Sequence, residues 1–84
     1  MTDATLLRQV GETLYGEHWR VRMAVSLDVS DRNVRRWLSG SLPIPEGVWR
    51  ELMALTFRQR VQIASVNDAV VNKVESLPVT DEAS

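Results

Sequence analysis

The stretch RMAVSLDVSDRNVRRWLSG, residues 22–40, holds two short apolar patterns separated by a break. Each pattern repeats every three or four residues, which is the spacing of one face of an α-helix. Together with the residues just before them, they predict helices over about residues 18–27 and 30–39. Ser30 suits the N-cap of the second helix because its hydroxyl can accept a hydrogen bond from a free amide of the first turn. The apolar positions are Trp19, Met23 and Leu27 in the first helix, and Val34, Trp37 and Leu38 in the second.

Two short helices joined by a turn of about three residues form a helix-turn-helix unit. Ala24 fits the contact between the helices, because a steep crossing at close range leaves room for little more than a methyl group. Val29 fits the turn, and Val34 and Trp37 are placed to anchor the second helix from below. Gly40 is expected to end that helix.

Three arginines, Arg32, Arg35 and Arg36, lie on the second helix of a chain whose net charge is −1. Residues 18–40 hold five arginines and two aspartates, a balance of +3, so the positive charge is concentrated there. At about 100° per residue, Arg32 and Arg36 point away from the apolar stripe, with Ser39 near them and Arg35 and Asn33 on the flanks. Such a face suits the major groove of B-DNA, where a guanidinium can bond both O6 and N7 of guanine.

The alternative is a merely solvated helix face. Asp31 precedes Arg35 by four residues, which is a favourable spacing for a surface ion pair. Because such a pair accounts for one arginine and not for three, we favour the DNA-binding interpretation.

The flanking segments complete an all-α fold of four to five helices. Residues 4–15 predict an amphipathic helix with Asp3 as its cap and Gly16 as its stop. Pro45 suits the first position of the last helix, since proline lacks the amide hydrogen that is unpaired there.

No residue between Val48 and Ser76 breaks a helix strongly, so this region is expected to be either one long helix or two helices with a bend near Thr56. Pro78 is expected to stop it. We therefore predict a DNA-binding domain over residues 1–57, a C-terminal helix over 58–76 and a flexible tail over 77–84.

The C-terminal helix carries more apolar residues than one small core needs, which predicts a homodimer interface. Two alternatives remain open: the helix folds back onto its own domain, or it binds another protein, as antitoxins bind toxins. The predicted interface residues are Phe57, Val61, Ile63, Val66, Val70 and Val74.

Several classes of protein are not expected. The chain has no cysteine, so disulfides and thiolate metal sites are excluded. No apolar run approaches the roughly 18 residues of a membrane span, and we expect a cytoplasmic, nucleoid-associated protein. His18 is the only histidine and has no second ligand at a suitable spacing, so we expect no metal, no cofactor and no enzymatic activity.

The stretch 22–40 resembles the helix-turn-helix of the phage-repressor family, the lambda repressor and Cro type. The segment PIPEGVWREL that follows resembles the continuation in small proteobacterial and phage members. The resemblance covers about residues 5–57. It departs at the turn, where Asp28 stands in place of the usual glycine; the position needs a left-handed backbone, which Asp tolerates better than most residues.

The resemblance implies a sequence-specific regulator that binds double-stranded DNA. The expected form is a dimeric repressor, or autorepressor of its own promoter, that binds a short inverted repeat with recognition helices about 34–36 Å apart. Small regulators of phages and mobile elements, including those of anti-CRISPR operons, share this build. The positions carried over for base contacts are Asp31, Arg32 and Arg36, with Arg35 meeting a base or a phosphate. Those for contacts to the DNA backbone are Arg20, Ser30, Asn33 and Ser39.

Overall fold

The computed structural model describes residues 1–79, which form four α-helices and no strand. The helices are α1 (Asp3–Tyr15), α2 (Trp19–Leu27), α3 (Asp31–Ser39) and α4 (Glu46–Glu75). The predicted all-α fold with a long C-terminal helix is therefore confirmed. Of the predicted tail, residues 80–84 lie outside the described part of the chain.

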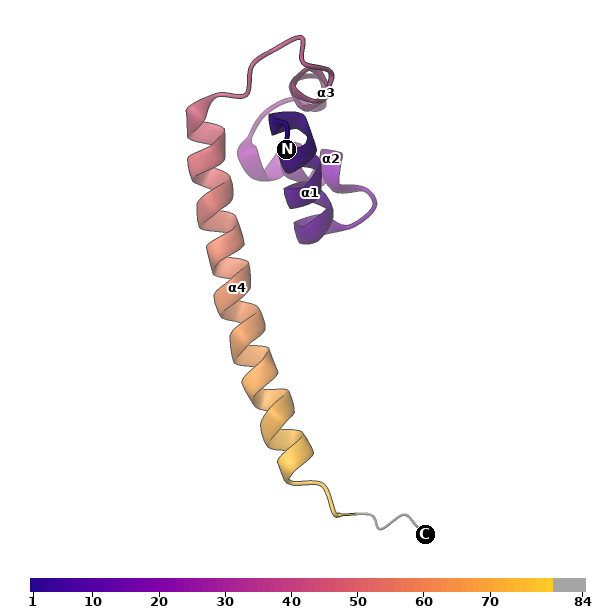
Figure 1. Ribbon diagram of the computed structural model, residues 1–84, viewed down its shortest axis with the longest axis vertical. Helices are drawn as coiled ribbons and strands as arrows, with labels where there is room; N and C mark the ends of the chain where they lie inside the picture. Colours follow the sequence, from indigo (N-terminus) through magenta and orange to yellow (C-terminus); the bar gives the residue numbers. More distant parts are fainter. Residues whose placement is uncertain (80–84) are drawn as a thin grey trace.

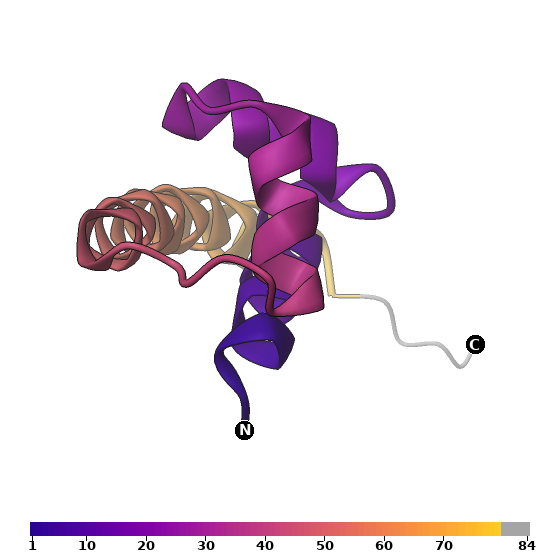
Figure 2. The same ribbon diagram turned by 90° about the horizontal axis from the view of Figure 1, so that it is seen from above.

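The helices are arranged as a small cluster attached to one end of a long rod. Helices α1, α2 and α3 all lie on one side of the first half of α4, while the second half of α4 extends away from them (Figures 1 and 2). The molecule measures 61 × 23 × 23 Å. Its radius of gyration is 18.5 Å, whereas a compact chain of this length would have one of about 12 Å.

The core lies where α1, α2 and α3 meet each other and the start of α4. Leu7, Met23 and Val34 are fully buried, one from each of the first three helices. The inward faces predicted for α2 and α3 are confirmed, because their apolar residues are buried or packed against this core. The buried hydrophobic residues are Leu7, Trp19, Met23, Ala24, Leu27, Val34, Trp37, Val48 and Leu52.

Gly11 of α1 lies against Trp19 of α2. A Cβ atom added there would lie only 2.0 Å from Cε3 of the Trp19 ring. The buried indole therefore lies directly against the backbone of α1, and only glycine leaves room for it.

The signals that end the helices act as predicted. Asp28 ends α2 in the left-handed conformation, with φ 56°, and its amide bonds back into the helix. Ser30 caps α3, since its Oγ accepts a hydrogen bond of 3.1 Å from the amide of Asn33. Gly16 and Gly40 end α1 and α3 at φ values of 79° and 81°.

Two predicted boundaries are off by one residue. The cap of α1 is Thr2 and not Asp3, because the Thr2 hydroxyl accepts from the amide of Thr5 and Asp3 already belongs to the first turn. Pro45 is the N-cap of α4 and not its first residue, since its ψ of 148° is extended. Glu46 begins the helix instead.

Helix α4 is one continuous helix, which settles the choice between one helix and two. Thr56, the site of the alternative bend, donates its hydroxyl hydrogen to the carbonyl of Leu52 at 2.9 Å. The hydroxyl is therefore satisfied within the helix, and the helical hydrogen-bonding pattern runs on to Glu75.

Candidate nucleic-acid interface

Helix α3 presents opposite chemistry on its two sides. Val34 is fully buried and Trp37 is 3 % exposed, so the apolar side is fixed in the core. Arg32 and Arg36 are exposed on the other side. Together with Arg35 and Ser39, they line a shallow, open hollow on the surface.

The position of α3 in the molecule makes this arginine surface accessible. Seen from above, α3 lies over α1 and α2 at the end of the molecule from which α4 leads away (Figure 2). The side of α3 that is not packed on the core therefore faces away from the far end of α4, and none of the other helices lies in front of it.

Arg35 differs from the other two arginines because it is paired. Its Nε donates to Oδ2 of Asp31 at 2.8 Å, and its terminal nitrogen lies 2.5 Å from the same oxygen. Such an exposed pair contributes at most about 1 kcal/mol to stability, but it partly neutralises both side chains. Within residues 1–79, neither Arg32 nor Arg36 takes part in an ion pair. The unneutralised charge of α3 is thus that of Arg32 and Arg36.

The polar residues predicted to meet the DNA backbone lie at the two ends of α3 and at the start of α2. The hydroxyl of Ser30 is used as a cap, and that of Ser39 donates to the carbonyl of Arg36 at 3.1 Å. Asn33 is half-buried on the flank of the helix. Both hydroxyls are therefore engaged at the two ends of the helix that carries the arginines.

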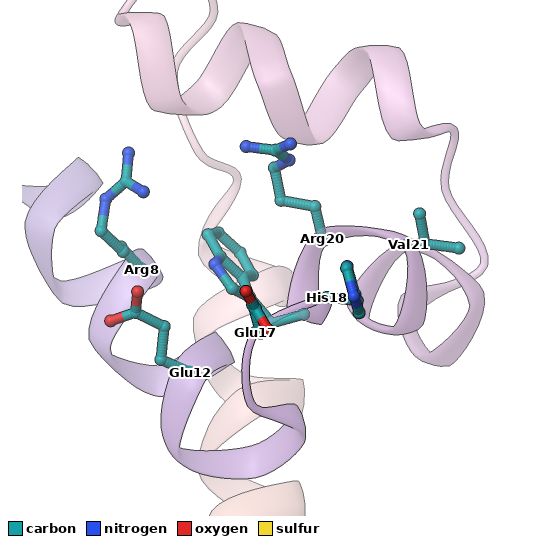
Figure 3. Close-up of a pocket in the computed structure, with 7 residues that line it drawn as sticks. Arg8, Glu12, Glu17, His18, Arg20 and Val21 are labelled. Carbon is teal, nitrogen blue, oxygen red and sulfur yellow. The ribbon is translucent and has the colours of Figure 1, made fainter.

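A second hollow brings together charged residues from α1 and the start of α2 (Figure 3). Arg8 and Arg20 point to the same side of it, and Glu12 and Glu17 lie below them in the view. The sequence predicts Arg20 among the residues that contact the DNA backbone, but it does not point to Arg8. The periodicity of one helix shows which side a residue occupies, and it does not show which residue of another helix it faces.

The six apolar residues predicted for a dimer interface are all exposed, by 52–60 %. None of them belongs to the core or packs against it, and the second half of α4 extends away from α1–α3 (Figure 1), so the described structure does not fold this helix back onto its own domain. At about 100° per residue they occupy two sides of α4. Phe57 and Val61 lie on one side, and Ile63, Val66, Val70 and Val74 lie on the other.

Comparisons with known proteins do not assign this surface. No family model, no curated protein and no solved structure matches the chain. In residues 1–79, no helix has the length and apolar character needed to cross a bilayer. The same residues contain no cluster of three histidine, aspartate or glutamate side chains placed to hold a metal ion.

Proposed function

We propose that the protein is a sequence-specific regulator that binds double-stranded DNA with α3 in the major groove. The observation that carries this proposal is the pair Arg32 and Arg36. They are one helical turn apart, exposed and without ion-pair partners in residues 1–79. They stand on a helix that the buried Trp37 holds in place.

Each side chain has a distinct part in the proposed complex. Arg32 and Arg36 read base edges, because an arginine fork can donate to O6 and N7 of one guanine. Arg35 reaches a base or a phosphate once it leaves Asp31, and Asp31 itself accepts from a cytosine amine when it is released. Contacts to the DNA backbone then fix the orientation without reading sequence, and they are assigned to Ser30, Asn33, Ser39 and Arg20, with Arg8 beside Arg20.

The regulatory outcome we propose is repression. A helix seated in the major groove of a promoter blocks that stretch of DNA for the transcription machinery. Nothing beyond occupancy is needed for this effect, and it applies equally to the promoter of the protein's own gene.

Selection from a pool of random duplexes with the full chain tests the proposal. We expect an enriched half-site that contains guanine. Arg36→Ala should weaken binding to that site by about 1–3 kcal/mol and relax the preference at one position. Arg58→Ala is the matched control, since it removes the same charge from an exposed position on α4, away from α3. A pool without enrichment at low ionic strength would refute the proposal.

A second candidate function is favoured by the exposed apolar residues of α4. In that case the protein is an interaction module whose C-terminal helix binds another protein, as an antitoxin does. Arg36→Ala separates the two functions. It weakens binding to the selected DNA and relaxes the preference at one position in the first case, and it leaves binding of the protein partner unchanged in the second.

A further inference from the structure

The extended half of α4, together with the turn that follows it, carries an apolar side over residues 63–77. At about 100° per residue, the four apolar side chains within α4 fall within about 40° of a common direction. The fifth, Leu77, follows two residues beyond the end of α4, in a turn in which its amide donates to the carbonyl of Val74 at 3.1 Å. The two acidic residues of this segment, Asp68 and Glu75, fall on the opposite side. The five are Ile63, Val66, Val70, Val74 and Leu77, each at least 50 % exposed.

This apolar side continues the side that packs on the core. Val48 and Leu52 are buried against α1–α3 and project in nearly the same direction as Val66 and Val70. The side is therefore covered by the protein's own helices near the start of α4, and it is uncovered beyond them (Figure 1).

The spacing of the five residues is symmetric about Val70. Ile63 and Leu77 are each seven residues from it, and Val66 and Val74 are each four residues from it. When two copies of a helix pack antiparallel around a two-fold axis, residues at equal distances before and after the axis meet each other. This side therefore complements itself in an antiparallel pair.

A parallel pair through the same side is blocked by the fold. Packed helices have axes 8–10 Å apart, and a single helix with its side chains is about 10 Å wide. In a parallel pair, the α1–α3 clusters of both copies would lie between the two α4 helices at the same level. The space there is too small for even one cluster.

We propose that a second copy of the chain packs antiparallel on this side of α4, with the two-fold axis at Val70. Val70 then meets the partner's Val70, Ile63 meets the partner's Leu77, and Val66 meets the partner's Val74. The contact is about 21 Å long. Phe57 and Val61 lie on the other side of α4 and take no part in it.

If α3 binds DNA as proposed above, this pairing makes the protein one that bridges two DNA segments; this step rests on the proposed function. Glu46 is 24 residues from the axis, so the two clusters lie at opposite ends, with the starts of α4 about 72 Å apart. Each α3 faces outward from its own end (Figure 2). The two recognition helices thus point in opposite directions and hold two separate duplex segments, in contrast to the single short inverted repeat expected from the resemblance.

Single cysteines test the pairing without DNA, because the chain has none of its own. Under mild oxidation, Val70→Cys should form a disulfide-linked dimer. Val61→Cys, similarly exposed at 52 % against 54 %, should stay monomeric in denaturing gels. Ile63→Cys alone should not link, whereas its mixture with Leu77→Cys should. Linking by Val61→Cys or by Ile63→Cys alone, or a wild-type chain that sediments as a monomer, would overturn the proposal.

A capture assay then tests bridging. The Val70→Cys dimer, loaded on an immobilised duplex carrying the selected half-site, should retain a second, fluorescent duplex. Val70→Asp should bind one duplex normally, retain no second one and sediment as a monomer, while Val61→Asp should behave as the wild type. If the linked dimer binds the immobilised duplex but retains no second duplex, bridging is refuted. Loss of binding to any duplex would refute the DNA-binding function and leave the cysteine result standing.

Discussion

At the scale of single residues, the contact between Gly11 and Trp19 leaves no room for a further side chain. Any side chain at Gly11 would overlap the indole ring, which is itself 3 % exposed. We expect Gly11→Ala to lower the free energy of unfolding by about 1–3 kcal/mol, as overpacking of cores does. Chemical denaturation measures this loss directly.

Gly47 provides the matched control for that substitution. It lies in the first turn of α4, and a Cβ there meets no atom within 4 Å. Gly47→Ala should leave stability unchanged or raise it by up to about 1 kcal/mol, because alanine favours helix more than glycine does. Equal stability of the two variants would show that α1 and α2 do not approach as closely as described.

At the scale of the helix, α3 depends on its cap. Ser30→Ala removes the acceptor for the amide of Asn33 and should cost about 0.5–2 kcal/mol of stability. It should also weaken DNA binding, since Arg32 lies in the first turn. Ser65→Ala, on the exposed middle of α4, should change stability by less than about 0.5 kcal/mol. Thermal melts of both variants check this, and a Ser65→Ala loss as large as that of Ser30→Ala would contradict the assignment.

Helix periodicity explains why the buried and exposed sides of a single helix could be predicted from the sequence. The inward positions Val34 and Trp37, and with them the outward arginines, follow from one helix considered alone. The closeness of Gly11 to Trp19, or of Arg8 to Arg20, depends on how two helices cross, which no single pattern contains. The sequence predicts the cap of α1 and the start of α4 one residue away from where they lie, because Thr2 and Asp3 are both good caps and proline suits either position next to a helix start.

At the scale of the whole molecule, the apolar side of α4 couples stability to concentration. A chain that folds together with a second copy melts at a temperature that rises with protein concentration. We expect this rise for the wild type and for Val61→Asp, and a constant melting temperature for Val70→Asp. Scanning calorimetry over a hundredfold range of concentration checks it, and a constant midpoint for the wild type would contradict the dimer.

The uneven distribution of charge also acts at this scale. The net charge is −1, and residues 18–40 carry the positive surplus. Binding to DNA should therefore weaken steeply with added salt, because each neutralised phosphate releases counterions. Arg20→Ala should reduce the slope of log affinity against log salt by about 1, while Arg58→Ala on α4 should leave it unchanged. Titrations at four salt concentrations measure these slopes. An equal slope for the wild type and Arg20→Ala would contradict the proposed contact between Arg20 and a DNA phosphate.

The placement of the three tryptophans has a practical consequence. Trp19 and Trp37 are buried and Trp49 packs against the same core. All three indole rings therefore lie where α1–α3 meet the start of α4. Intrinsic tryptophan fluorescence thus reports solvent entry into the core, and it does not respond to contacts made or broken along residues 58–79. A dimer that dissociates while the α1–α3 cluster stays folded would keep its tryptophan emission spectrum, whereas unfolding of the cluster would change it. The emission spectrum of the unlabelled protein would therefore distinguish dissociation from unfolding.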